Sequence, residues 1–546
     1  GPGLFQGGND VLNGGPGYDT MFGGGGDDIF FAGDGIDTMQ GDSGFDWLNY
    51  EQNVRFDNGP TNRPSVFMDL SNTLTNPIAS TTEDQVVDFE GLSGSAGNDV
   101  LAGRNAADIT VPTVLVPTGG NKGLLTLVLP GTIGGIDSGM RVSGTGVGTY
   151  ATTVGQGITS IVNGVTVTTV TLTDQNYANV TGPVTFSVWP LENPNLITNL
   201  TPLISSTLGW TKHLTGNPNA TIWTGGTILL GGDGNDTLHP IAGDNVIHGS
   251  DYLHTCIKVS TSGFTNPGAD VTCGGGLGYS KMSLLNSIMD SGAVNPSELS
   301  IIREILPTSV SVTGYSADGS KVVYTAANNF YVGESISISG ITPTKYNLIN
   351  AIVTAADATS FTVASIVSTG SATGLTGALA VATDTVAVPG TVDQYSIVPF
   401  VPAGGLPAGT GSAYKLISKD GRQDIIYDVQ MISFAGAAAV PISASTPALT
   451  SLTVTPGTFA PTFAPNTLNY TLVVDHLNPT SGAVQDVTSA VITPVAAAVG
   501  ATIQIKVGNG TPRAAVSGQP FTVTGLSVTG ATTIQIIVTA MDKVTQ

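Results

Sequence analysis

The chain has 546 residues and is acidic, with 39 Asp and Glu against 17 Lys and Arg and a formal net charge of −22 at pH 7. This balance excludes nucleic-acid binding, which requires a basic face, and no run of about eighteen apolar residues occurs that could span a bilayer. Charged residues make up only 10% of the chain, and the abundance of Gly, Thr, Val and Ala predicts a mainly β protein of several domains.

The first predicted element is a repeat. Residues 5–49 form five consecutive nine-residue blocks with the pattern G-G-x-G-x-D-x-U-x, where U is a large apolar residue. This pattern predicts a calcium-binding parallel β-roll in which two blocks complete one coil, so that residues eighteen apart stack. An apolar residue in register in every block argues against a flexible Gly/Asp-rich linker. The aspartates at the sixth position are Asp10, Asp19, Asp28, Asp37 and Asp46.

The residue types suit calcium, a hard cation that takes six to eight oxygen ligands. Glycines permit tight turns with positive φ and direct backbone carbonyls towards the stacked carboxylates. Without the ion those carboxylates repel one another, so we expect the roll to be largely unfolded without calcium. Weak sites of this kind require millimolar calcium, which indicates an extracellular or cell-surface location. The glycines of the predicted turns are Gly15, Gly17, Gly24, Gly26, Gly33 and Gly35.

Further copies of the repeat lie later in the chain. GSAGNDVLA contains Asp99, and GGDGNDTLH contains Asp236 with Gly232 and Gly234, whereas PIAGDNVIH has Asn245 in place of the aspartate. The repeats predict a roll over residues 1–110 and a second repeat patch with short helices over 222–307. Between them, residues 111–221 have no net charge and alternate β-branched residues, which predicts an inserted β-sandwich. Removing this insertion would bring Asp99 close to Asp236 in one continuous roll.

The remaining elements follow in chain order. Helical spacing over 279–289 and an Asn295-Pro296 start before SELSIIREIL predict the short helical segment. A second inserted sandwich is expected over 308–400, a hairpin returning to the framework at Asp420-Gly421 within 401–445, and a separate sandwich over 449–546. Cys256 and Cys273 either form one disulfide or remain two thiols; the sequence leaves both open.

No enzymatic motif is evident. His239 and His248 lie nine residues apart, on opposite sides of the predicted roll, which is a poor arrangement for zinc. No G-x-S-x-G motif with triad partners occurs, and calcium accounts for the paired carboxylates better than acid/base catalysis does. We therefore expect a protein without catalytic activity.

The nonapeptides resemble the RTX, or hemolysin-type, calcium-binding repeats of proteins exported by type I secretion. GFDWLNYE, VVDFEGLSGSAGNDVLAG, IHGSDYL and AVNPSELSIIREI look like the RTX region that follows a haem-peroxidase domain in some large bacterial proteins. The terminal unit is similar to cadherin-like modules, and the insertions look like Ig-like modules. The resemblance implies calcium ligands at Asp10, Asp19, Asp28, Asp37, Asp46, Asp99 and Asp236. Departures from the repeat are Phe5, Gln6, Ala32, Asp42 and Asn245.

These observations favour a calcium-rigidified structural or adhesive surface protein that self-associates, or joins other surface components, in a layer, sheath or filament. The alternative is a non-catalytic secretion and folding region of a larger secreted haem peroxidase, which a catalytic domain upstream of Gly1 would favour. A phage or virion fibre is a third hypothesis, suggested by the inserted modules alone.

Overall fold

A computed structural model gives the fold. The structure describes residues 8–52, 63, 65–74, 84–105, 113–116, 121–133, 141–148, 151, 153, 158–172, 175–180, 182–187, 191, 194–207, 210–212, 221–223, 226–260, 279–282, 288, 291–292, 294–365, 367–402, 404–442, 449–460, 462–463, 469–473, 486–496, 501–528 and 530–539. The fold is mainly β, as predicted. The chain divides into two compact units, the first comprising residues 1–389, 401–413 and 422–436, and the second comprising 390–400, 414–421 and 437–546.

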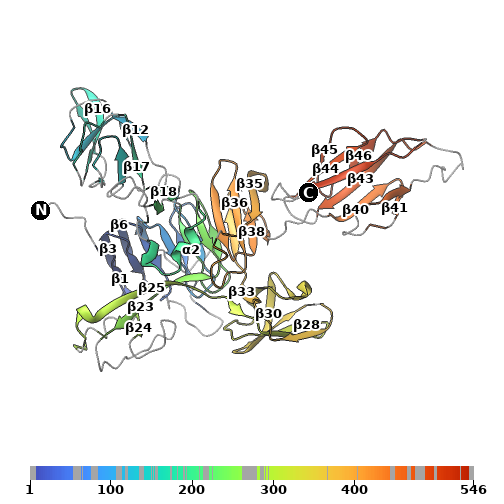
Figure 1. Ribbon diagram of the computed structural model, residues 1–546, viewed down its shortest axis with the longest axis horizontal. Helices are drawn as coiled ribbons and strands as arrows, with labels where there is room; N and C mark the ends of the chain where they lie inside the picture. The colour runs from blue at the N-terminus through green and yellow to red at the C-terminus, as the bar shows by residue number, and fades with distance from the viewer. Residues whose placement is uncertain are drawn as a thin grey trace. The chain divides into compact units, whose positions relative to one another are not determined.

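The first unit is built on a β-roll whose first face is a parallel sheet (Figure 1). Neighbouring strands pair in register, and the middle residue of each points into the roll. These residues form a column that includes Phe30, Leu48, Leu92, Leu229 and Ile247, all fully buried. Burial of each side chain stabilises the folded state by about 1.5–3 kcal/mol relative to leaving it exposed. The strands in spatial order are β1 (Val11–Asn13), β4 (Ile29–Phe31), β7 (Trp47–Asn49), β10 (Gly91–Ser93), β20 (Ile228–Leu230), β22 (Val246–His248) and β37 (Gln423–Tyr427).

The second face of the roll consists of parallel strands in two sheets. One contains β3 (Thr20–Gly25), β6 (Thr38–Ser43) and β9 (Gln85–Val87). The other contains β8 (Phe67–Asp69), β11 (Val100–Ala102), β21 (Thr237–His239), β34 (Thr385–Val388) and β38 (Met431–Phe434). Two short strands in the turns, β2 (Pro16–Gly17) and β5 (Asp34–Gly35), also pair in parallel. Parallel pairing between strands up to about 180 residues apart shows that the roll is one body interrupted by insertions.

The first insertion contains two antiparallel three-stranded sheets around one core. Leu127, Leu129, Val170 and Phe186 are fully buried there. One sheet has β12 (Thr113–Val116), β17 (Gly182–Ser187) and β14 (Arg141–Gly144), and the other has β13 (Thr126–Pro130), β16 (Val165–Thr171) and β15 (Ile158–Val162). It is followed by η1 (Pro194–Leu196), the helix α2 (Leu200–Ile204) and the hairpin of β18 (Trp210–Lys212) and β19 (Thr221–Trp223).

The helix predicted to start at Asn295-Pro296 is corrected by the structure. Residues 299–307 form the strand β25 (Leu299–Pro307), which pairs over its whole length with β23 (Asp251–Val259) after a single 3-10 turn, η3 (Pro296–Glu298). The β-branched Ile301, Ile302 and Ile305 favour this extended pairing over a helix. β24 (Tyr279–Lys281) is also a strand. Of the rest of 279–289 the structure describes only Met282, in a 3-10 turn, and Ile288, in α-helical conformation.

Cys256 on β23 is fully buried and disulfide-bonded, while Cys273 lies outside the described residues.

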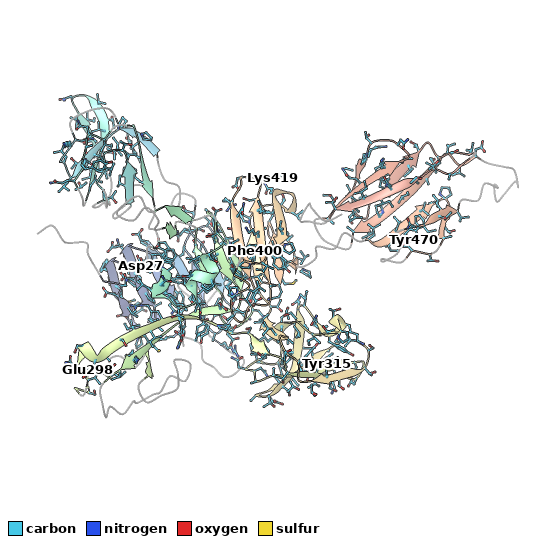
Figure 2. All side chains as sticks on the ribbon, in the orientation of Figure 1. Asp27, Glu298, Tyr315, Phe400, Lys419 and Tyr470 are labelled. Carbon is cyan, nitrogen blue, oxygen red and sulfur yellow. The ribbon has the colours of Figure 1, made fainter. Side chains whose placement is uncertain are left out.

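The second insertion is an eight-stranded antiparallel sheet curled around one core, in which Tyr324, Ile336 and Phe361 are fully buried; the core includes Tyr315, labelled in Figure 2. Its spatial order is β26 (Val310–Ser311), β33 (Leu379–Ala382), β29 (Ser335–Ser339), β30 (Ala351–Asp357), β31 (Ser360–Ala364), β28 (Lys321–Thr325), β27 (Gly314–Ala317) and β32 (Gly370–Thr373), with η4 (Thr344–Tyr346) between β29 and β30. The range expected for this insertion, 308–400, includes β34, which the structure places in the roll.

The second unit contains η5 (Val392–Gln394) and the antiparallel pair β35 (Tyr395–Pro399) and β36 (Ala413–Ser418). β36 ends just before Asp420-Gly421, the turn predicted from the sequence, where Gly421 has φ 95°. After β39 (Val440–Pro441) comes the C-terminal module, whose core includes Leu452, Ile492 and Ile505. Its sheets are β40 (Leu449–Thr455), β43 (Ser489–Ala496) and β46 (Phe521–Thr524); β41 (Thr458–Ala460) and β42 (Thr471–Val473); and β45 (Arg513–Ala515), β44 (Thr502–Val507) and β47 (Ile534–Thr539).

Candidate calcium-binding turns

The predicted aspartates form hydrogen-bonded ladders along the edges of the roll. Each stands immediately before a strand, and from the second coil onward its Oδ1 accepts a hydrogen bond from the backbone N–H of the equivalent residue one coil earlier. Asp28 Oδ1 accepts from Asp10 N at 2.7 Å, and Asp46 Oδ1 accepts from Asp28 N at 2.8 Å. On the opposite edge Asp37 Oδ1 accepts from Asp19 N at 2.8 Å. The eighteen-residue spacing therefore stacks these carboxylates, as the sequence predicts.

The ladders continue across both insertions. Asp236 Oδ1 accepts from Asp99 N at 2.7 Å, although the two residues are 137 positions apart. The prediction that Asp99 and Asp236 share one continuous roll is therefore confirmed. Asp384 Oδ1 accepts from Asp236 N at 2.9 Å, over 148 positions, and so extends the ladder beyond the second insertion.

Sequence reasoning missed several ladder residues that lack a preceding glycine-rich turn. Glu90 Oε2 accepts from Asp46 N at 2.9 Å, and Asp84 Oδ1 accepts from Asp37 N at 2.9 Å. Asp424 Oδ1 likewise accepts from Asn245 N at 2.9 Å. Each of these residues, like Asp384, is followed two positions later by an apolar residue. An acidic residue two places before a buried apolar one was the signal that could have found them.

The second carboxylate oxygens of the ladder suit a cation. Oδ2 of Asp19, Asp28, Asp46 and Asp236 is buried and has no hydrogen-bond partner. Oxygens from neighbouring coils converge on the glycines: a Cβ built on Gly41 would lie 2.5 Å from Asp46 Oδ2 and 2.2 Å from the Asp88 carbonyl oxygen. The same pairing recurs at Gly231, with Asp236 Oδ2 at 2.5 Å and Gly249 O at 2.3 Å. Carboxylate and carbonyl oxygens held together in this way are the ligands that calcium prefers.

The glycines predicted to shape the turns all have positive φ: Gly15, Gly17, Gly24, Gly26, Gly33, Gly35, Gly232 and Gly234. A side chain is excluded at Gly35, where a Cβ would lie 1.4 Å from the Gly17 carbonyl oxygen of the preceding coil. Asp42, which replaces a glycine of the repeat, also adopts positive φ, at 66°.

Burial disfavours the ionised form of Asp28, Asp46, Asp99 and Asp236 when no cation is bound. Desolvation raises the pKa of Asp28 to about 6 and that of Asp99 to about 7. The pKa values of Asp46 and Asp236 are raised well above the ordinary range, first by desolvation and then by neighbouring carboxylates. Among the described residues, no three Asp, Glu, His or Cys side chains converge as a metal site, so a calcium ion here would depend on the backbone carbonyls as well.

The two histidines of adjacent repeats do not form a metal pair. His239 lies on β21 and His248 on β22, which belong to different sheets of the roll. His248 is fully buried, with Nε2 3.1 Å from Thr410 Oγ1, and burial lowers its pKa to about 3. Its ring stacks on Tyr427 with the centroids 5.7 Å apart, so it belongs to the core of the roll.

Comparison with known families supports this assignment of the turns. The family model of the RTX calcium-binding nonapeptide repeat matches in four copies, at residues 6–39, 31–49, 92–110 and 224–251. No curated protein matches the chain. The repeats fit a calcium-stabilised secreted protein, since proteins with RTX repeats are typically exported by type I secretion. Within the described residues, no helix is long and apolar enough to cross a membrane.

Proposed function

We propose that this chain is a non-enzymatic extracellular protein with a structural or adhesive role, in which calcium stiffens one roll that displays β-modules. The observation that carries the proposal is the continuity of the ladders from Asp99 through Asp236 to Asp384 across both insertions. Modules inserted in this way have both chain ends fixed in the roll. Binding of calcium in the turns would therefore fix the attachment points of the modules.

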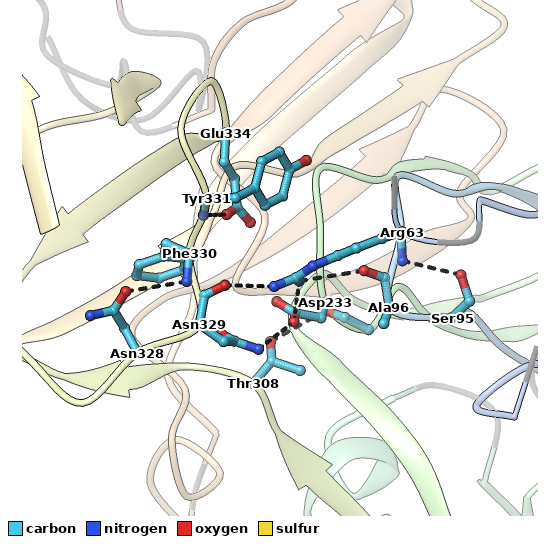
Figure 3. A network of polar contacts seen from close by, with 12 residues as sticks. Arg63, Ser95, Ala96, Asp233, Thr308, Asn328, Asn329, Phe330, Tyr331 and Glu334 are labelled. Carbon is cyan, nitrogen blue, oxygen red and sulfur yellow. Dashed lines mark hydrogen bonds and ion pairs between the residues drawn. The ribbon is translucent and has the colours of Figure 1, made fainter. Parts of the chain in front are cut away.

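The attachment of the second module supports this coupling (Figure 3). Arg63 forms an ion pair with Asp233, and its Nη2 donates to Asn329 O at 2.6 Å. Asn329 Nδ2 donates in turn to Asp233 Oδ2 at 2.8 Å. Asn235 Oδ1 accepts from Ser335 N at 3.0 Å. Asp233 and Asn235 belong to the repeat turn that contains Asp236, so ordering of this turn by calcium would also order the anchor of the module.

We also propose that the chain self-associates, and the edge strand β15 of the first insertion supports this. β15 reads ITSIV, and Ile158 and Ile161 are 68% and 74% exposed. Edge strands are normally protected by charges, prolines or bulges. Two edges of the C-terminal module have such protection, a bulge near Leu449 in β40 and Arg513 in β45, whereas β15 has none. We further propose that the two insertions are Ig-like modules and that the C-terminal module is cadherin-like.

Light scattering and electron microscopy of the purified chain, with millimolar calcium and with EDTA, test this function. We expect ordered homopolymers in calcium alone, and we expect Ile161→Lys to reduce them. Val516→Lys is the matched control, because Val516 is 68% exposed but lies in the C-terminal module. A strictly monomeric chain at high concentration in saturating calcium would contradict self-association and favour the secretion and folding region of a larger haem peroxidase.

A further inference from the structure

One turn of the roll contains a buried arginine that forms an ion pair with a ladder carboxylate. Arg104 follows Gly103 at the end of β11, just before the chain leaves the roll for the first insertion, and Gly226-Thr227 is where the chain returns. Gly103 and Thr227 face each other as the first and sixth positions of one split repeat turn: a Cβ on Gly103 would lie 2.9 Å from Thr227 Oγ1. The carboxylate of the repeat is therefore replaced by a neutral hydroxyl in this turn.

The guanidinium of Arg104 contacts the oxygen types that would bind a cation. Nη1 lies 3.1 Å from Glu90 Oε1, and Nη2 donates to the Gly226 carbonyl oxygen at 3.1 Å. The backbone N–H of Arg104 donates to Thr227 Oγ1 at 3.0 Å. Arg104 is only 5% exposed and Glu90 only 1%, so both charged groups are removed from water.

The charges along this ladder change at the same point. Asp28 and Asp46 precede Glu90, and each has a buried second oxygen without a hydrogen-bond partner. Both oxygens of Glu90 have partners, Oε2 with Asp46 N and Oε1 with Arg104. The next two ladder residues, Thr227 and Asn245, are neutral. A buried carboxylate requires a compensating charge, and here the chain itself supplies one.

We propose that the Arg104 guanidinium takes the place of a calcium ion in the turn formed by Glu90, Gly226 and Thr227. This turn then binds no calcium, and it joins β10 to β20 across the first insertion without metal. The roll thus contains a calcium-independent joint where its chain is interrupted, with calcium-dependent coils before it. The inference rests on the calcium binding proposed above for the other turns.

Hydrogen exchange measured by mass spectrometry on the full chain tests the joint. In EDTA, the amides of β10 and β20 should stay protected while those of β1 and β4 exchange freely. Free exchange of the amides in all four strands would overturn the proposal, whereas protection of all four in EDTA would instead contradict the calcium dependence of the roll. This wild-type measurement decides the question even if the variants below do not fold.

Substitution of the arginine gives a second test. Arg104→Ala should speed exchange of the β10 and β20 amides in EDTA on the order of a hundredfold, because Glu90 is left buried and unpaired. Calcium should restore protection, with one more ion bound per chain in an equilibrium dialysis measurement. Arg513→Ala, which removes an arginine from the C-terminal module, should leave both readouts unchanged. Unaltered protection of β10 and β20 in Arg104→Ala would overturn the proposal.

Discussion

Asp28→Asn should shift the stability of the first coils in opposite directions with and without calcium. Asp28 is fully buried, and its Oδ2 has no hydrogen-bond partner. Its pKa of about 6, against an ordinary value of 3.8, corresponds to about 3 kcal/mol that opposes folding of the calcium-free protein at neutral pH. Removing the charge should recover part of this free energy while keeping the hydrogen bond from Asp10 N.

The chain itself shows how asparagine fits in a ladder. Asn245 Oδ1 accepts from Thr227 N at 2.8 Å, and its Nδ2 donates to Asp424 Oδ1 at 2.8 Å. An asparagine at position 28 can therefore accept the bond from Asp10 N in the same way. In calcium, however, the variant loses a charged ligand, and its affinity for the ion should fall on the order of tenfold or more.

Hydrogen exchange of the β1 and β4 amides in EDTA measures the first effect, and calcium titration calorimetry measures the second. Asp10→Asn is the matched control, because Asp10 is exposed and its replacement should change the calcium-free stability little. Exchange of the β1 and β4 amides in Asp28→Asn that is no slower than in the wild type in EDTA, or an unchanged calcium affinity, would contradict this prediction.

Three further predictions follow from the same geometry. In EDTA the free energy of unfolding of the roll should fall as the pH rises from about 4 to about 7, because the raised pKa values of Asp28 and Asp99 mean that the folded chain binds more protons than the unfolded chain in that window. With calcium, protons compete with the ion, and the free energy of unfolding should rise over the same window. Urea denaturation at several pH values measures both trends. Chelation should melt residues 1–50 while the module at 449–546 survives, and circular dichroism that does not change on addition of chelator would contradict this. Gly41→Ala should destabilise the roll by about 1–3 kcal/mol, since its Cβ would lie 2.2 Å from Asp88 O, while Gly404→Ala, where nothing lies within 4 Å, should be neutral in a thermal melt.

The repeat pattern predicts the roll because its two requirements are local. Glycine at the turn and an apolar residue two positions after the aspartate are visible in nine residues, so Asp28 and Asp236 could be identified without a structure. Glu90 and Asp384 could not, because the turns before them are shortened or interrupted by an insertion, and their partners Asp46 and Asp236 are distant in sequence. The error at 299–307 has a similar cause: Asn295-Pro296 is a valid helix start, but pairing with β23, which is not visible in the local sequence, decides for a strand.

The second carboxylate oxygens of the ladders are expected to bind calcium in one continuous roll. Anomalous diffraction from crystals grown in millimolar calcium tests it most directly. We expect calcium peaks at about 2.3–2.6 Å from Oδ2 of Asp28, Asp46 and Asp236, and no peak beside Arg104. Crystals in calcium without peaks at these aspartates, or with the Oδ2 atoms directed away from the ions, would contradict it.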